Sequence, residues 1–253
     1  MEQLFKECCD FIDAEYKRLG HTLGYRFLTC PQNLLNPDMK LLYLSQSPAG
    51  GTDIKEHPKT SCEYGSPFFV ERWDGKEAGT SVLQQQTRQM FAMLQAQLKI
   101  PGTVRNFAEQ HILSGYFIPF RDYASHKNKN ETDEEKKKSK EKEKACLASA
   151  HQLWQKIFQK WTPSCILISG TSVGKEVKKI LKSLNFTITE VTPIDIQWQG
   201  RKIYIYTAKR DDKTIRIASF PSLSRYKTMN SGKYTIYFRE MLEQIFSSNQ
   251  TND

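Results

Sequence analysis

The stretch CILISGTSVGKEVKKIL, residues 165–181, decides the fold that the sequence predicts. It begins with a short apolar run typical of a buried strand and then reaches Gly170. Val173, Val177 and Ile180 follow at the three- and four-residue spacing of a helix with one buried face. A strand that passes through a glycine turn into a helix is the repeating unit of α/β proteins.

Other segments of the chain repeat this alternation. Further apolar runs predict strands at Leu41–Leu44, Tyr116–Phe120 with the residues before it, Ile203–Tyr206 and Ile215–Ala218. Apolar residues at helical spacing predict helices at Leu83–Leu98, Leu147–Phe158 and Tyr234–Phe246. The alternation predicts one α/β domain over residues 1–253, a three-layer α/β/α sandwich around a central, mostly parallel sheet.

The composition is that of a soluble protein. The 253 residues carry 37 Lys and Arg against 28 Asp and Glu, a formal charge of +9, and 38% of them are hydrophobic. No run approaches the roughly 18 apolar residues of a membrane-spanning helix, and the amino terminus lacks the pattern of a signal peptide. We therefore expect a cytoplasmic monomer without membrane contact.

The cysteines do not indicate a metal site. They lie at positions 8, 9, 30, 62, 146 and 165, and no pair has the C-x-x-C spacing of a zinc or iron–sulfur site. We expect reduced thiols, no metal and no cofactor.

Charge is spread unevenly along the chain. Residues 126–144 hold eight Lys and six acidic residues, which predicts a charged low-complexity insert: a disordered loop, a charged helix extension or an arm that touches nucleic acid. Residues 201–239 hold ten Lys or Arg and only two acidic residues, a net of +8. Nearly all the surplus charge therefore lies in the last third of the chain.

The segment GTSVGK, residues 170–175, resembles a P-loop at first glance. A P-loop has four residues between its glycines and Ser or Thr after the lysine, whereas this segment has three and is followed by Glu176. A tight turn between a strand and a helix explains the segment without nucleotide hydrolysis.

Three other loops follow predicted strands, where α/β sheets bind their ligands. The loop in KLLYLSQSPAGGTD, residues 40–53, is rich in small residues and fits either a close backbone approach to a ligand or a plain turn. SGYFIPFRD, residues 114–122, places aromatic residues beside Arg121, and Asp122 is interpreted as the surface ion-pair partner of Arg121. The hydroxyls and Arg225 of FPSLSR, residues 220–225, suit phosphate contacts.

In this order, the loops resemble those of the uracil-DNA glycosylase superfamily over residues 38–246. Residues 45–50, SQSPAG, occupy the position of the family's first motif, G-Q-D-P-Y-H or G-L-N-P-G. Residues 220–224, FPSLS, are similar to its late motif H-P-S-P-L-S, and SGYFIPFRD is similar to the family strand that ends in N-x-x-P-F-R. The stretch 165–181 looks like the family's strand, glycine turn and helix. The resemblance implies the family's three-layer fold and an enzyme that flips a nucleotide out of DNA and excises its base.

Two departures fall on the family's catalytic residues. Ser47 stands where the family has the Asp or Asn that positions water, and Phe220 stands where it has the His that stabilises the departing base. Ser47 alone is too weak a base, and Phe220 cannot donate a hydrogen bond. Asp53 is the candidate replacement, with Glu63 and Glu71 as second choices; alternatively, Asp53 only caps a turn.

The base pocket implied by the resemblance also differs. Ala49 replaces the family Tyr that rejects substituents at pyrimidine C5, and Gly50 and Gly51 leave further room. Tyr116 is the nearest equivalent of the family's base-reading Asn. The sequence therefore suggests a glycosylase that excises a bulky modified base, such as glucosylated hydroxymethylcytosine of phage DNA, in antiviral defence.

The residues assigned to this function form three groups. Ser47 and Asp53 are the candidate catalytic residues, and the candidate base-binding residues are Gln46, Pro48, Ala49, Gly50, Tyr116, Phe117 and Phe220. The candidate DNA-binding residues are Arg121, Ser222, Leu223, Ser224, Arg225 and Lys227, with Leu223 filling the space that a flipped base leaves in double-stranded DNA. The alternative is a catalytically silent DNA- or RNA-binding module that has kept the fold.

Overall fold

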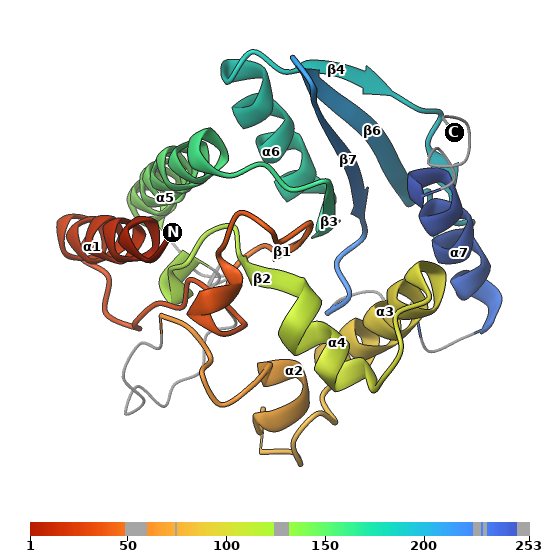
Figure 1. The fold of residues 1–253 in the computed structure, drawn as a ribbon. Coiled ribbons are helices and arrows are strands. Elements are labelled where there is room, and N and C mark those ends of the chain that lie inside the picture. The colour runs from red at the N-terminus through yellow and green to blue at the C-terminus, as the bar shows by residue number, and fades with distance from the viewer. Residues whose placement is uncertain (49–59, 74, 124–131, 225–228, 230–231, 247–253) are drawn as a thin grey trace.

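The computed structural model describes residues 1–48, 60–73, 75–123, 132–224, 229 and 232–246. A seven-stranded mixed sheet crosses the molecule, and helices cover both of its faces (Figure 1). The strands are β1 (Leu41–Ser45), β2 (Ile112–Tyr116), β3 (Cys165–Ser169), β4 (Thr187–Glu190), β5 (Ile194–Asp195), β6 (Lys202–Arg210) and β7 (Lys213–Phe220). Their order is β2-β1-β3-β7-β6-β4, with β5 paired to β6.

The helices fall into two layers, one on each face of the sheet. They are α1 (Glu2–Arg18), α2 (Pro67–Val70), α3 (Val82–Leu98), α4 (Val104–His111), α5 (Asp133–Lys160), α6 (Thr171–Ser183) and α7 (Gly232–Phe246), with short 3₁₀ turns η1 (Gln32–Leu34) and η2 (Arg121–Tyr123). One core joins the sheet to α1, α5 and α6, and the second joins it to α3, α4 and α7. The predicted α/β architecture with helices on both faces is confirmed at this level.

Four adjacent strands, β2, β1, β3 and β7, run parallel and in register. Their last residues, Tyr116, Ser45, Ser169 and Phe220, pair with one another across the sheet. The carboxyl ends of all four strands therefore meet in one row at one edge of the sheet, which we call the carboxyl edge.

The sheet departs from the sequence prediction at its second strand. The second strand ends at Tyr116 rather than Phe120, because the chain beyond it turns aside and the amide of Ile118 donates to the carbonyl of Gln46. β6 and β7 form an antiparallel hairpin, since too few residues separate them for the crossover that parallel strands need.

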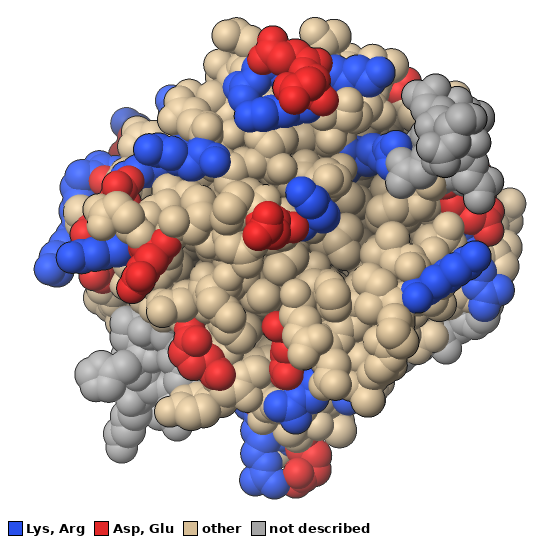
Figure 2. Space-filling view, viewed as in Figure 1, with Lys and Arg blue, Asp and Glu red and all other residues tan. Residues whose placement is uncertain are grey.

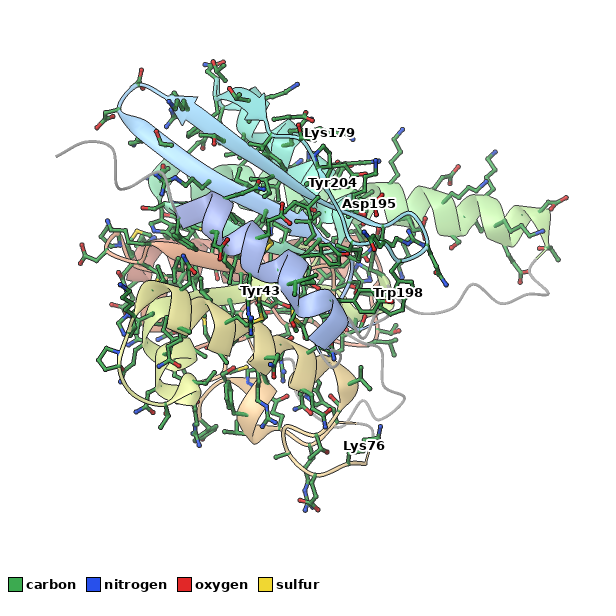
Figure 3. The ribbon with its side chains drawn as sticks, turned by 90° about the vertical axis from the view of Figure 1, so that its right-hand side faces the viewer. Tyr43, Lys76, Lys179, Asp195, Trp198 and Tyr204 are labelled. Carbon is green, nitrogen blue, oxygen red and sulfur yellow. The ribbon has the colours of Figure 1, made fainter. Side chains whose placement is uncertain are left out.

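Much of the charged insert is helical. Thr132 caps the amino end of α5 and forms a capping box with Glu135, so residues 133–144 make up the first turns of this helix. These turns extend away from the body of the molecule (Figure 3). The helix-extension interpretation is confirmed for residues 133–144, and residues 126–131 lie outside the described residues.

Gly174 fixes the distance between α6 and the sheet. A Cβ atom at this position would overlap the side chain of Ser219 on β7 and would come within 3.4 Å of the Tyr206 hydroxyl. Tyr206 also donates a hydrogen bond of 2.8 Å to the Gly174 carbonyl. The second glycine of GTSVGK therefore serves close packing of helix against sheet.

We expect Gly174→Ala to destabilise the fold, although alanine favours helices more than glycine. The added methyl must push α6 from β7, which costs about 1–3 kcal/mol in a well-packed core. Urea unfolding measures the free energy, with Lys175→Ala on the exposed face of the same helix as the control. Equal stability of the two variants would contradict this account of the packing.

Candidate functional site

A cleft of about 230 Å³ opens at the carboxyl edge, between the ends of β1, β3 and β7. Its lining comes from segments far apart in the sequence: Gln46, Gly170, Thr171, Ser172, Arg201, Pro221, Ser222 and Ser224. We call it the carboxyl-edge cleft. Ligands of open α/β sheets bind in such positions, beyond the ends of parallel strands.

The amino end of α6 forms one side of this cleft. Gly170 has a φ of 129°, a conformation that side chains disfavour, and no side chain caps the helix. Thr171 and Ser172, the first residues of the helix, line the cleft. Free amide groups and the positive end of the helix dipole attract anions at such a position.

The lining of the cleft also includes a cation and two hydroxyls. Arg201 comes from the turn before β6, and Ser222 and Ser224 follow β7. The two serine Oγ atoms are 2.9 Å apart and hydrogen-bonded. With the amino end of α6, these groups form a set of donors suited to a phosphate or another oxyanion.

Beneath the cleft, Ser169 holds the loop that follows β7. Its Oγ accepts a hydrogen bond of 3.1 Å from the amide of Leu223. Leu223 and Phe220 are both fully buried in the core formed with α3, α4 and α7. The expectation that Leu223 projects to fill a vacated base stack is wrong for this structure, and Phe220 packs against Phe238 rather than facing a base.

The first predicted motif is only partly described. Gln46 is exposed and lines the cleft, Ser47 is half-buried and Pro48 is buried. The Gln46 side chain also hydrogen-bonds the Tyr123 hydroxyl. Five predicted site residues lie outside the described residues, namely Ala49, Gly50, Asp53, Arg225 and Lys227.

The second predicted loop divides between the two faces of the sheet. Tyr116 lies in the row of strand ends, and burial raises the pKa of its hydroxyl to about 12, so this group stays a proton donor. Phe117 is fully buried in the core on the α5 side, where its carbonyl accepts from Trp154 Nε1 at 2.9 Å. A base-stacking role for Phe117 is therefore wrong in this structure. Arg121 is half-buried in η2.

A half-buried ion pair lies next to Tyr116. Arg26, which is 4% exposed, donates to Glu71 Oε2 at 2.9 Å, and Trp73 Nε1 donates to the same oxygen at 2.9 Å. The Nε atom of Arg26 is buried without a hydrogen-bond partner among the described residues. Among the candidate carboxylates, Glu71 interacts electrostatically with Tyr116 but does not line the carboxyl-edge cleft. Glu63 is exposed and accepts a hydrogen bond from the Ser61 hydroxyl.

The turn that supplies Arg201 also supplies Trp198, which forms an aromatic pair with Tyr234 of α7. Trp198 stacks on Tyr234 with ring centroids 5.0 Å apart and an interplanar angle of 18°. The Arg201 amide donates to the Trp198 carbonyl at 2.9 Å, and Asp195 braces the turn through the amide of Gln197. Figure 3 shows Trp198 beside the helix α7, whose amino end carries Tyr234. Both rings are half-buried and keep part of their surface open to solvent.

Sequence reasoning missed several of these residues. Thr171 and Ser172 were assigned to a plain turn, and Arg201 was only one charge in a basic region. The signal for the first two was the glycine between strand and helix, which marks the amino end of a helix at a strand end. The sequence carries no such signal for Arg26. Its position depends on the long-range bridges that the segment around it, residues 25–28, forms with residues 115 and 120.

The charges are mixed on the face of the molecule shown in Figure 2. Basic and acidic side chains lie close to each other around a broad uncharged area there. Within the described ranges, no group of three or more His, Cys, Asp and Glu is arranged to hold a metal ion. All six cysteines are free thiols.

A Cys–His–Asp arrangement elsewhere resembles a catalytic triad. Cys146 Sγ lies 3.5 Å from His21 Nε2, and Asp122 Oδ2 lies 3.5 Å from His21 Nδ1 without the alignment of a hydrogen bond. Cys146 is fully buried, and burial raises the pKa of its thiol to about 11. A protonated thiol without access to solvent is not a nucleophile, so this cluster is structural.

Asp122 belongs to that cluster and corrects a sequence prediction. Its carboxylate is 8% exposed and accepts from the amides of Thr22 and Leu23 at 3.0 and 2.9 Å. Lys142, on the charged part of α5, lies 3.5 Å away. Asp122 therefore anchors the loop after α1, and its carboxylate is buried rather than at the surface.

Comparison of the chain with protein-family models and with curated proteins finds no match. In the part of the chain that the structure describes, no helix is both long enough and apolar enough to span a membrane.

The His21 cluster predicts a pH dependence of stability. Burial, followed by the charge of Lys142, lowers the pKa of His21 against the opposing effect of Asp122, so the folded protein holds a neutral imidazole. In the unfolded chain this imidazole binds a proton near pH 6.5. The free energy of unfolding is therefore highest above that pH and decreases as the pH falls below it, by up to about 1.4 kcal/mol per pH unit.

His21→Phe keeps a ring against Phe120, whose centroid is 4.3 Å away, and should flatten this dependence. The measurement is the free energy of unfolding in urea from about pH 7.5 to 5.5, a window above the carboxylate titrations. His111→Gln, at an exposed histidine, is the control. An unchanged slope in His21→Phe would assign the pH dependence to other groups.

Proposed function

We propose that the protein binds DNA at the carboxyl edge, flips a nucleotide toward it and hydrolyses the N-glycosidic bond of a modified base. In this proposal the chain is a divergent relative of the uracil-DNA glycosylases. The base is a pyrimidine with a bulky C5 substituent, such as glucosylated hydroxymethylcytosine of phage DNA, and the biological role is antiviral defence.

One observation carries the proposal. The four segments that resemble the glycosylase motifs follow β1, β2, β3 and β7, and these strands end in one row at the carboxyl edge. Residues from three of these segments line a single cleft, although Gln46 and Ser224 are 178 positions apart in the sequence. A shared functional site requires this convergence, and open α/β sheets bind their ligands at such an edge.

The cleft supplies groups for the DNA backbone. Arg201, the amino end of α6 and the hydroxyls of Ser222 and Ser224 line the same cleft. Arginine pairs with two phosphate oxygens at once, and amides and hydroxyls complete the contact. Contacts of this kind anchor a strand in register without reading its sequence.

The Trp198–Tyr234 pair supplies an aromatic surface for a base. Its turn is continuous with Arg201, so a strand whose phosphate is bound in the cleft passes close to the rings. Base–aromatic stacking contributes about 1–3 kcal/mol per base and tolerates different bases. In this proposal Trp198 takes the stacking role that the sequence assigned to Phe117 and Phe220.

Hydrolysis requires a carboxylate at this edge. Water attacks C1′ of the sugar, the bond from C1′ to the base nitrogen breaks, and the water proton is transferred to a carboxylate or to the departing base. The sugar develops positive charge in the transition state, which an ionised carboxylate stabilises. Asp53 and Glu71 are the candidates, and Glu71 is held by Arg26 and Trp73 as an anion suited to that role.

The alternative function is a silent nucleic-acid-binding module. Specific observations favour it: Ser47 and Phe220 replace the family's catalytic residues, and Phe220 is fully buried. The module would use the same phosphate groups and the same aromatic pair without cleaving a bond.

A glycosylase assay tests the proposal. The protein is incubated with DNA that contains uracil, hydroxymethylcytosine, glucosylated hydroxymethylcytosine or no modification, and alkali then breaks the strand at abasic sites. We expect cleavage of the glucosylated DNA alone. We also expect Asp53→Asn or Glu71→Gln to lower the rate by about a hundredfold or more, with DNA affinity unchanged.

Glu77→Gln, at an exposed carboxylate paired with Arg72, is the matched control and should keep full activity. Intact DNA in every reaction, together with a mobility shift, would replace the enzyme by the silent module. Full activity of both Asp53→Asn and Glu71→Gln would overturn the assignment of the carboxylate.

Salt dependence tests the phosphate site separately from the chemistry. We expect the logarithm of the association constant for DNA to fall linearly with the logarithm of salt concentration, because phosphate contacts release bound cations. Arg201→Gln should weaken binding and reduce the magnitude of that slope by about 1. Lys76→Gln, at an exposed residue that does not line the cleft and lies apart from Trp198 in Figure 3, should change neither quantity. Salt-independent binding would contradict the phosphate site.

A further inference from the structure

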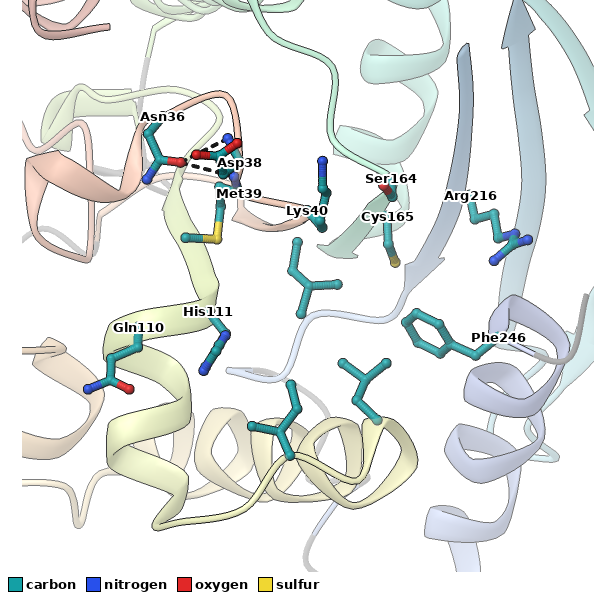
Figure 4. A pocket seen from close by; sticks show the side chains of 13 residues that line it. Asn36, Asp38, Met39, Lys40, Gln110, His111, Ser164, Cys165, Arg216 and Phe246 are labelled. Atoms are coloured by element: carbon teal, nitrogen blue, oxygen red, sulfur yellow. Dashed lines mark hydrogen bonds between the residues drawn. The ribbon is translucent and has the colours of Figure 1, made fainter. Parts of the chain in front are cut away.

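A second pocket opens at the opposite edge of the sheet, where β1 and β3 begin (Figure 4). Its volume is about 620 Å³, which falls in the range of roughly 300–1,000 Å³ typical of small-molecule sites. We call it the amino-edge pocket and define it by Lys40, Leu41, Leu98, Ile100, Arg216 and Phe246. The carboxyl-edge cleft shares none of these residues.

Apolar side chains from three elements meet inside the amino-edge pocket. Leu41 begins β1, while Leu98 and Ile100 come from the end of α3 and the turn after it. The ring of Phe246, at the end of α7, points toward them (Figure 4). These side chains offer an aliphatic or aromatic body a surface that excludes water.

Arg216 brings a cation to this apolar surface. In the strand register, Leu41 of β1 lies beside Cys165 of β3, and Cys165 lies beside Arg216 of β7. These three side chains therefore project from the same face of the sheet. Lys40 lies one residue earlier, at the rim, and its side chain points away from the apolar surface in Figure 4. Two cations, Lys40 and Arg216, stand against one acidic residue, Asp38, a net of +1 among the lining residues, with His neutral.

The chemistry of the pocket favours binding over catalysis. Its cysteine, Cys165, is 2% exposed, and burial raises the pKa of the thiol to about 12. The thiol therefore stays protonated and unreactive. The imidazole of His111 stacks on Phe107 with centroids 5.8 Å apart.

We propose that the amino-edge pocket binds a small organic monoanion, a carboxylate joined to an aliphatic or aromatic body. The carboxylate pairs with the planar guanidinium of Arg216, and the body lies on Leu41, Leu98 and Ile100. The planar guanidinium offers two parallel N–H donors, which match the two oxygens of a carboxylate. This site is independent of the function proposed for the carboxyl-edge cleft.

Isothermal titration of the full chain tests the site with phenylbutyrate as the probe. Acetate has the same charge without the body, and phenylbutanol has the body without the charge. We expect saturable binding of phenylbutyrate and at least tenfold weaker binding of the other two, because each lacks one of the two contacts.

Two variants locate the binding. Arg216→Gln removes the cation and should weaken phenylbutyrate binding about tenfold or more. Leu98→Trp, at a half-buried position on α3, should fill the pocket and weaken binding to a similar extent. Arg201→Gln, in the carboxyl-edge cleft, is the control and should bind the probe as the unchanged protein does.

Absence of saturable binding would overturn the proposal, as would equal binding of phenylbutyrate and phenylbutanol. Circular dichroism checks the fold of each variant. If Arg216→Gln does not fold, Leu98→Trp decides the location, and unchanged affinity in a folded Leu98→Trp would exclude the amino-edge pocket.

Discussion

The in-register pairing of four parallel strands is the constraint on which the rest of the structure depends. Because Tyr116, Ser45, Ser169 and Phe220 pair in one row, the loops that follow them start from a common edge. The close contact of Gly174 with β7 then sets the distance of α6 from the sheet. A shift of one residue in any pairing would turn that strand's side chains to the other face and separate its loop from the cleft.

The same constraint gives the two edges of the sheet different chemistry. At the carboxyl edge, helix α6 begins and presents amide groups beside Arg201 and two serine hydroxyls. At the amino edge, α3 and α7 end over the beginnings of the strands, and their last turns bring Leu98 and Phe246 beside Arg216. The first arrangement suits the phosphates of an extended polymer, and the second suits a compact molecule with one charge and an apolar body.

Periodicity predicted the fold more fully than it predicted the site. The strand and helix of residues 165–181 were legible because burial on both faces of a parallel strand leaves a continuous apolar run. The burial of Phe117, Phe220 and Leu223 gave no such signal, since large apolar residues at strand ends serve cores as well as ligands. The Arg26–Glu71 pair joins residues 45 positions apart, and a contact of that range follows from tertiary packing alone.

Hydrogen–deuterium exchange of the full chain, with and without a DNA duplex that carries the glucosylated base, tests the central claim most directly. The account predicts that DNA slows amide exchange in residues 169–173, 198–202 and 221–224, which come together only at the carboxyl edge. Slowed exchange confined to α1 and α5, which do not line the carboxyl-edge cleft, would contradict the account. So would DNA binding that leaves all three segments unprotected.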